Sequence, residues 1–243
     1  MPRTRSVTAG ATDFTAVSLR CRSSGSREDS RRPPAENRAQ IGSDAVVTGS
    51  DAVVTDIRRE TQAVVLVEGI SDHVALEALA GRRGRDLRAE SVAVVPIGGA
   101  QAIGRFLERF GPRESALRLA GLCDAGEERE FKRGLERAGL GRELTRADME
   151  RLGFYVCVTD LEDELIRALG ARTVEEIVGV QGDLRRFRTL QKQPAWTGRP
   201  LDAQLQRFMG SGGSRKTRYA RLLVEALHLA DVPRPLDGVL AHV

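Results

Sequence analysis

Four short apolar runs, separated by segments with helical character, constrain the fold of this 243-residue chain more than any other feature. The runs are rich in β-branched residues and cover residues 63–67, 91–97, 117–123 and 154–158. Helix-like segments fall at about 72–81, 100–110, 127–139 and 145–152. Short, continuously apolar strands that alternate with helices are typical of a parallel sheet buried on both faces. The sequence therefore predicts an α/β fold with about four mainly parallel strands and helices on both faces.

The segments on either side of this alternating core, which we place at residues 59–170, have a different character. Residues 1–58 are rich in Ser, Arg, Gly and Pro, repeat GSDAVVT at 42–48 and 49–55, and are expected to be disordered. Residues 171–243 show helical and loop signals and are expected to form a basic helical extension that packs on the core. Two capping boxes, Thr145 with Asp148 and Thr173 with Glu176, are expected to open helices.

Hydropathy and cysteine content exclude several classes of protein. No apolar run approaches the ~18 residues that a membrane span needs, and the basic N-terminus has no continuous apolar segment of signal-peptide type. The three cysteines lack CxxC spacing, which argues against a disulfide framework and against a zinc site. The expected location is the cytoplasm.

Charge is distributed unevenly along the chain, whose net charge is +4. Residues 61–170 hold 16 Lys and Arg against 19 Asp and Glu, whereas residues 171–243 hold 12 against 7. An acidic centre beside a basic segment would suit a cation site next to a phosphate-binding surface. From charge alone, ordinary solvated surface is the simpler interpretation.

Acidic residues follow three of the four predicted strands at the point where each strand ends. In chain order they are Glu68 and Asp72, then Asp124 with Glu127 and Glu128, then Asp160 and Glu162. The carboxyl ends of parallel strands meet at one edge of a sheet, where open α/β folds bind ligands. Carboxylates gathered there would repel one another unless cations intervene, and Mg²⁺ or Mn²⁺ is the natural choice for oxygen ligands. The sequence therefore predicts a divalent-metal site at this edge.

A simpler role exists for each acid taken singly. Acids at strand ends and helix starts often only cap the helix, and for Asp124 alone capping is at least as good an explanation as metal binding. The coincidence across three strands favours metal binding over capping.

The same residues carry a resemblance to a known family. A strand that ends in VEG, a second followed by GGA, a third that ends in Asp and a fourth followed by DLE resemble a Toprim domain, the fold of topoisomerases, bacterial primases and OLD-family nucleases. LVEGISDHVAL is most similar to the OLD type, whose E-G-x-S-D motif Glu68, Gly69, Ser71 and Asp72 match. The similarity covers about 63–170 and extends more loosely to Lys216, at a position where OLD-type domains tend to carry a catalytic lysine.

Two departures from the family pattern stand out. Toprim domains usually carry an Asp-x-Asp pair after the third strand, and here Gly126 holds the second position, so that Glu127 or Glu128 would have to replace the missing ligand. OLD nucleases usually have an N-terminal ATPase, and a tail of about 60 residues is too short for one. The resemblance thus implies a free-standing Toprim module.

The activity that this resemblance implies is metal-dependent hydrolysis of phosphodiesters, with DNA favoured over RNA. Glu68, Asp72 and Asp124 would hold one ion, and Asp160 and Glu162 would contribute to a second. Lys216 would neutralise charge on the scissile phosphate, and the cations of the same helix start, Arg215, Lys216 and Arg218, would hold backbone phosphates. For Lys216, a solvated position at a helix start is an equally good interpretation.

Other functions compete with the nuclease. The chain could be a non-catalytic nucleic-acid-binding subunit that works with a separate ATPase, or a phosphatase for small esters, although phosphatases generally place an aspartate where Glu68 stands. For any of these functions the protein could be a homodimer. The GSGGSRKT stretch has phosphate-loop spacing, but Arg215 replaces the second glycine and the preceding segment looks helical, so we predict no ATP site. Aromatic residues make up only 4%, which argues against base stacking as the main mode of nucleic-acid binding.

Overall fold

The computed structural model describes residues 61–110 and 117–243, and the predicted disordered tail with its tandem repeat lies outside these residues. A four-stranded, all-parallel sheet has the order β2-β1-β3-β4. The strands are β1 (Ala63–Val67), β2 (Val92–Pro96), β3 (Arg118–Cys123) and β4 (Phe154–Val156). Val65 of the central strand β1 lies opposite Val94 on one side and Ala120 on the other. The prediction of a parallel sheet of about four strands is confirmed.

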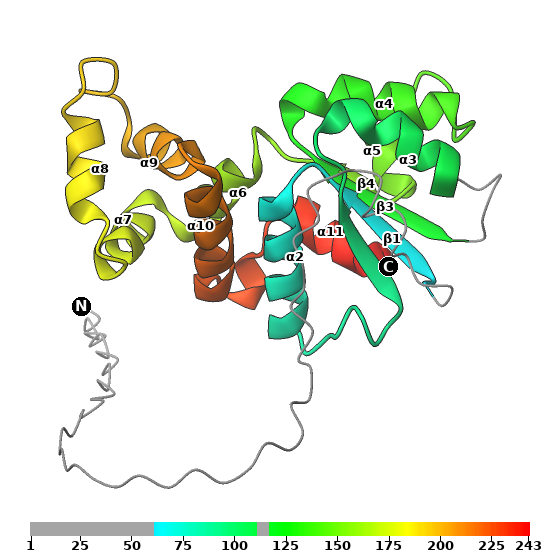
Figure 1. Cartoon of the computed structure of the whole chain (residues 1–243), viewed down its shortest axis with the longest axis horizontal. Helices are drawn as coiled ribbons and strands as arrows, with labels where there is room; N and C mark the ends of the chain where they lie inside the picture. Colours follow the sequence, from blue (N-terminus) through cyan, green and yellow to red (C-terminus); the bar gives the residue numbers. More distant parts are fainter. Residues whose placement is uncertain (1–60, 111–116) are drawn as a thin grey trace, which may run out of the picture. The chain divides into compact units, whose positions relative to one another are not determined.

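Helices cover both faces of the sheet because side chains of β1 alternate between two buried clusters. Val64 and Leu66 pack toward one face, with α3 (Ile103–Phe110), α4 (Glu128–Arg137) and α5 (Arg146–Arg151). Ala63, Val65 and Val67 pack toward the other face, which α2 (Ile70–Arg82) covers. Figure 1 shows α3, α4 and α5 together on one side and α2 with the last helix on the other. Short 3₁₀ turns, η1 (Ala100–Ala102) and η2 (Ala125–Glu127), precede α3 and α4.

The predicted C-terminal extension is helical and shares the buried cluster beneath α2. After α6 (Leu161–Leu169), its helices are α7 (Ala171–Val180), α8 (Leu184–Gln191), α9 (Leu201–Gly210), α10 (Gly213–Ala226) and α11 (Arg234–His242), with η3 (Leu229–Asp231) before the last. Arg82 of α2 donates two hydrogen bonds to carbonyl oxygens at the end of α10, those of Val224 (2.8 Å) and Leu227 (2.5 Å). The extension and the sheet are therefore one packed unit over the described residues.

Of the two predicted helix-capping boxes, one is confirmed and one is wrong. Thr145 and Asp148 form the predicted capping box at the start of α5. The second predicted box is wrong, because α7 already begins at Ala171 and Thr173 lies inside it. Gly170, at φ 82°, ends α6 and starts α7 with no intervening loop, and this left-handed conformation is one that glycine adopts readily. No helix in the described ranges is long and apolar enough to cross a membrane.

Candidate functional site

The acidic edge of the sheet is built around Glu68, the residue that follows β1. Its Oε1 atom accepts a hydrogen bond of 2.7 Å from the backbone N–H of Asp124, the residue that follows β3. Burial raises the pKa of Glu68 although this hydrogen bond opposes the rise, and the nearby charges of Asp72 and Glu127 raise it further. Two neighbouring strands thus bring their first acids into direct contact.

Asp72 lies in the first turn of α2 and is 6% exposed. Its Oδ2 atom accepts a hydrogen bond of 3.0 Å from the N–H of Gly69, the residue at the helix start. Burial raises the pKa of Asp72, and Lys216 and the backbone hydrogen bond reduce that rise. The strand-to-helix turn therefore places two carboxylates, four residues apart, at one edge.

The turn after β2 is hydrogen-bonded to the backbone of Glu68. Gly98 and Gly99 have φ angles of 77° and 108°, and both donate backbone hydrogen bonds to the carbonyl oxygen of Glu68, at 3.2 and 3.1 Å. A side chain at either position would be strained because positive φ is costly for residues with a Cβ atom. The GGA motif thus supports the backbone of the β1 acid.

The Asp124 carboxylate has no hydrogen-bond or ion-pair partner among residues 61–110 and 117–243. It stands at the start of η2, but its side chain makes no capping hydrogen bond there, so the capping interpretation does not hold for this residue. Burial raises the pKa of Asp124 to about 8, with further contributions from the negative charges of Glu68 and Asp72. A carboxylate so destabilised in its ionised form is suited to receive a cation.

The two acids after β4 differ in their surroundings. Asp160 caps α6, with Oδ1 accepting from the N–H of Asp163 and Oδ2 from Nε2 of Gln206, both at 2.8 Å. Glu162 is 5% exposed, and its Oε1 atom finds no hydrogen-bond partner among the described residues. Burial raises the pKa of Glu162 to about 7, although Lys216 opposes this.

Lys216 reaches these acids from the first turns of α10. Its Nζ atom lies 3.4 Å from Oε2 of Glu162. Burial by itself lowers the pKa of Lys216, but the charges of Glu162, Asp72 and Asp124 outweigh burial and raise it. The lysine is therefore protonated and faces the acids of three different strand ends. One ammonium charge cannot compensate all of these carboxylates.

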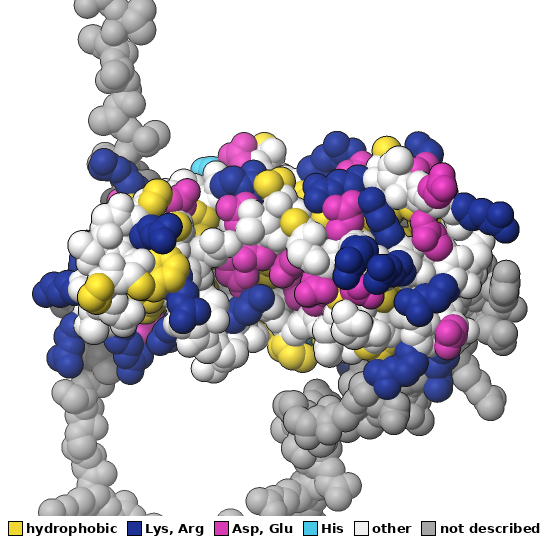
Figure 2. All heavy atoms as spheres, turned by 90° about the horizontal axis from the view of Figure 1, so that it is seen from above, with side chains coloured by type: hydrophobic (Ala, Val, Ile, Leu, Met, Phe, Trp, Pro, Cys, Tyr) yellow, Lys and Arg dark blue, Asp and Glu magenta, His cyan; other side chains and the backbone are white. Residues whose placement is uncertain are grey.

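A hollow of about 1000 Å³ opens between the acidic edge and α10. Glu68, Asp72 and Asp124 line one side, and Lys216, Arg218 and Arg221 line the other. Viewed from above, acidic side chains gather in the middle of the described region, with basic side chains on either side of them (Figure 2). The arrangement offers carboxylates to a cation and guanidinium groups to an anion within one space.

Comparison with known proteins supports this assignment of the fold. Residues 61–124 match the family model for the TOPRIM domain of overcoming lysogenization defect (OLD)-like proteins. The chain carries an OLD-like Toprim domain. No curated protein sequence matches the chain.

Solved structures similar to this Toprim-containing chain include C-terminal regions of two bacterial OLD proteins. The region from Xanthomonas campestris pv. campestris is 21% identical, with a TM-score of 0.57 over 76% of this chain and 95% of that one. The region from Burkholderia pseudomallei is 17% identical, with a TM-score of 0.58 over 75% of this chain and 96% of that one. At these identities the likeness is one of fold, and it includes the helical extension.

The structure separates the two candidates for the missing second acid of the Toprim Asp-x-Asp pair. Glu128 is held by Lys132 and Arg146, each at 2.8 Å, and these contacts lower its pKa although burial raises it. Glu127 is close enough to Glu68 to raise the pKa of that residue. Of the two, Glu128 is the acid engaged by cations within the chain, and Glu127 is the one whose charge acts on Glu68.

The predicted phosphate-binding residues do not all face the hollow. The Arg215 guanidinium lies 4.4 Å from the centre of the Phe208 ring and donates to the Phe208 carbonyl and to Oγ of Ser211. It thereby ties the end of α9 to the start of α10. Arg218 does line the hollow, and it also pairs with Asp183.

Sequence reasoning missed Asp183, which fixes α10 in place. This carboxylate is 3% exposed, accepts a hydrogen bond of 3.0 Å from the hydroxyl of Tyr219, and pairs with Arg186 and Arg218. Its partners lower its pKa although burial raises it. In the sequence, Asp183 precedes α8 and resembles an ordinary helix-capping acid, so no local signal marks it.

The donor set of the Toprim site fits a hard divalent ion. Across residues 61–110 and 117–243, no three His, Cys, Asp or Glu side chains are grouped closely enough to form a ready-made metal site. Three of the acids, Glu68, Asp72 and Asp160, have hydrogen-bond partners within the chain. The unpartnered Oε1 atom of Glu162 and the raised pKa of the Asp124 carboxyl nevertheless mark uncompensated negative charge. Side-chain rotation would be needed to bring these oxygens onto one ion.

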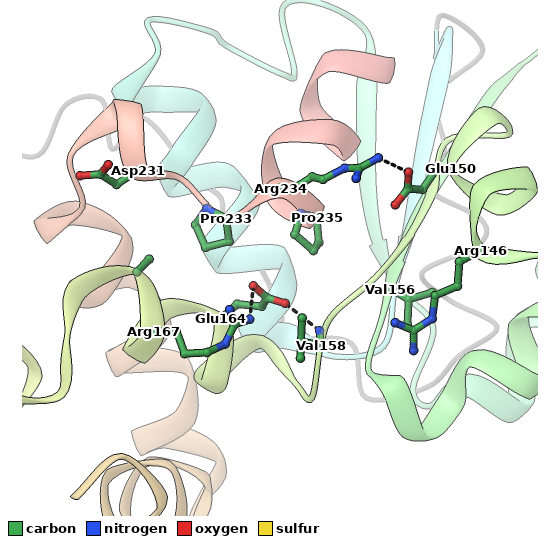
Figure 3. Close-up of a pocket in the computed structure, with 11 residues that line it drawn as sticks. Arg146, Glu150, Val156, Val158, Glu164, Arg167, Asp231, Pro233, Arg234 and Pro235 are labelled. Atoms are coloured by element: carbon green, nitrogen blue, oxygen red, sulfur yellow. Dashed lines mark hydrogen bonds and ion pairs between the residues drawn. The ribbon is translucent and has the colours of Figure 1, made fainter.

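A second hollow, of about 470 Å³, lies between β4, α6 and the start of α11 (Figure 3). Glu164, from the same DLEDEL motif as Glu162, points into it, accepts from the N–H of Val158 at 2.7 Å and pairs with Arg167 at 2.7 Å. Arg234 pairs with Glu150 across the hollow, and Arg146 pairs with Glu128. Its three arginines are thus all paired with carboxylates of the chain.

Proposed function

We propose that this protein is a divalent-metal-dependent nuclease that hydrolyses phosphodiester bonds in DNA. The observation that carries the proposal is the meeting of Glu68, Asp72 and Asp124 with Lys216 in one hollow at the carboxyl edge of a parallel sheet. Carboxylates from separate strands and a lysine from a distant helix match what phosphoryl transfer requires, namely cation ligands beside a fixed positive charge. The OLD-like Toprim match supports a role in nucleic-acid chemistry.

Each group has a proposed role. Glu68, Asp72 and Asp124 would hold one Mg²⁺ or Mn²⁺, and Asp160 and Glu162 would contribute ligands to a second. When bound, such ions supply Lewis-acid stabilisation of the phosphate and activation of the attacking water. Lys216 would neutralise charge that develops on the scissile phosphate, while Arg218 and Arg221 would hold the neighbouring phosphates without reading sequence.

A non-catalytic role is the second candidate. Gly126 stands where the second acid of the Asp-x-Asp pair is expected, and the carboxylates of Glu68 and Asp72 each accept a backbone hydrogen bond within the chain. On this view the protein would bind DNA, with a separate ATPase as a partner, and would not cut it. DNA binding would then survive substitution of Glu68 or Asp124.

A plasmid-nicking assay separates the two candidates. Purified protein should convert supercoiled plasmid to open circles in Mg²⁺ or Mn²⁺ and not in EDTA. Glu68→Gln and Asp124→Asn should abolish nicking, because each removes a charge that a cation requires. Both variants should still unfold cooperatively on heating, which shows that loss of nicking is not loss of the fold.

Glu128→Gln is the matched control for this assay. It also removes a carboxylate near the end of β3, but that carboxylate is paired with Lys132 and Arg146, so nicking should continue at the wild-type rate. Wild-type protein that binds plasmid but leaves it supercoiled with both metals would favour the non-catalytic candidate.

A further inference from the structure

A third hollow, of about 580 Å³, adjoins the acidic edge on the side of α9. Asp160 lies in its wall, and Gln206 of α9 holds the Asp160 carboxylate there through a hydrogen bond of 2.8 Å. The residues of α9 that line this hollow are called its floor, and those of the connection between α8 and α9 are called its rim. The volume falls within the range of sites for small ligands. The floor and rim residues are Ala203, Gln206, Arg207 and Gly210, with Ala195, Trp196 and Arg199.

Trp196 is the single tryptophan of the chain, and its position in the rim is fixed. The backbone N–H of Trp196 donates to the Gln193 carbonyl, and the backbone carbonyl of Trp196 accepts from Nε2 of Gln204, both at 2.8 Å. Gln204 is buried and is itself held by Nε2 of Gln191 at 2.7 Å. Trp196 is half-buried: it packs against the core and also lines the hollow. The hydrogen bonds of its backbone hold this aromatic residue in place at the hollow.

Two arginines, Arg199 and Arg207, line the same hollow as Trp196. Arg199 and Arg207 are both exposed. Within the part of the chain that the structure describes, no hydrogen bond or ion pair engages either guanidinium group. The hollow of Figure 3 differs here, because its arginines are paired with carboxylates. Free guanidinium groups around an aromatic ring are suited to an anion that carries a flat ring.

Some residues that line this hollow are close in sequence to residues that line the Toprim site. Gly210, at the end of α9, lines this hollow, and Gly213 and Lys216, at the start of α10, line the hollow that holds the acids. Only Ser211 and Gly212 separate the two helices. The ends of α9 and α10 that line the two hollows are therefore neighbours in the chain, and Asp160, an acid of the strand-end set, lines the hollow beside Trp196.

We propose that this hollow binds an unpaired nucleotide of the DNA strand next to the cleavage position, with its base against Trp196 and its phosphates at Arg199 and Arg207. The inference rests on the proposed nuclease function and specifies its substrate: DNA with a single-stranded segment beside the scissile phosphate. Base faces are buried in a duplex by stacking, so only an unpaired base can lie on an indole.

Intrinsic fluorescence tests this directly, because all tryptophan emission comes from Trp196. Titration with oligo(dT) of about 12 nucleotides in EDTA and low salt should quench the emission in a saturable way. An abasic oligonucleotide of the same length supplies the phosphates without bases and should bind without quenching. Saturable binding of oligo(dT) with unchanged emission, equal quenching by the abasic strand or by a fully paired duplex, or equal quenching by free dTMP at the same concentration would each overturn the proposal.

Variants give a second readout, measured by fluorescence anisotropy of labelled oligo(dT). Trp196→Ala should weaken binding by roughly 5- to 150-fold, the range for loss of one aromatic–base stack, whereas Trp196→Phe should stay close to wild type because it keeps a stacking face. Arg207→Ala should weaken binding and flatten its salt dependence. Arg172→Ala, an exposed arginine of α7 outside the hollow, is the matched control and should have a smaller effect than Arg207→Ala.

Failure of this inference is distinguishable from failure of the nuclease proposal. The fluorescence titration needs neither metal nor hydrolysis, so quenching without plasmid nicking would retain the strand-binding hollow and reject the nuclease. Metal-dependent nicking with no quenching and no effect of Trp196→Ala would retain the nuclease and reject the hollow as a base site.

Discussion

At the scale of single residues, the site is defined by carboxylates whose ionised forms are costly. Glu162 is the sharpest case, since one of its oxygens has no partner among the described residues and the other is 3.4 Å from an ammonium group. Burying a charged group without full pairing destabilises the folded state. Such residues persist at functional sites, where a bound cation or substrate provides the missing interaction.

Glu162→Gln should therefore stabilise the protein in EDTA while impairing nicking. The pKa of Glu162 is about 7 when folded against about 4.5 when unfolded, so the folded state binds more protons and wild-type stability falls as pH rises between these values. The stability of Glu162→Gln should not decrease in this way. Relative to wild type, its unfolding free energy should be about 1–3 kcal/mol higher at pH 8 and little changed at pH 5. Urea denaturation at both pH values measures it. An equal effect at both would contradict the role of ionisation.

At the scale of secondary structure, α10 is the element on which the site depends. It carries Lys216, Arg218 and Arg221 to the acidic edge of the sheet. Asp124 of that edge is more than 90 residues earlier in the chain than Lys216. Two contacts anchor it: Asp183 holds its middle through Tyr219 and Arg218, and Arg82 of α2 holds its carboxyl end. A cation at a helix C-terminus satisfies free carbonyl groups and interacts favourably with the helix dipole.

Arg82→Ala should loosen α10 and weaken nicking, although Arg82 does not line the hollow. Loss of two hydrogen bonds to charged nitrogen should lower the unfolding free energy by about 1.5–3 kcal/mol, and hydrogen exchange should accelerate in residues 213–226. Arg88→Ala removes an exposed arginine from the segment after α2 and should leave both measurements unchanged. Unaltered exchange in α10 for Arg82→Ala would show that packing alone holds the helix.

At the scale of the whole molecule, repulsion at the acidic edge links folding to divalent ions. An ion that binds only the folded state stabilises it according to its concentration, by about 2.7 kcal/mol at one hundred times Kd. Mg²⁺ or Mn²⁺ should thus raise the melting temperature of wild-type protein, with a much smaller rise for Asp124→Asn. An equal rise in both proteins, or none in wild type, would argue against binding at this edge. Differential scanning calorimetry against metal concentration makes the comparison.

Much of this organisation was predictable from local patterns. The strand runs were assigned to within a few residues because β-branched apolar segments bounded by glycine and acid are distinctive. The acids that follow β1 and β3 could be placed together because parallel strands end at one edge. Local patterns failed at Thr173, where the motif for a helix start falls inside a helix, because Gly170 had already ended the preceding one.

Local sequence patterns were sufficient to predict the α/β class, the parallel sheet and the acids at its edge, because these depend on periodicity and on the ends of strands. Which charges pair with one another depended on how the helices pack: Arg215 joins α9 to α10, Asp183 pairs with Arg218, and Glu128 pairs with Lys132 and Arg146. The physical reason is that an ion pair depends on the distance between groups from separate elements. Helix packing sets that distance, and no spacing along the chain encodes it.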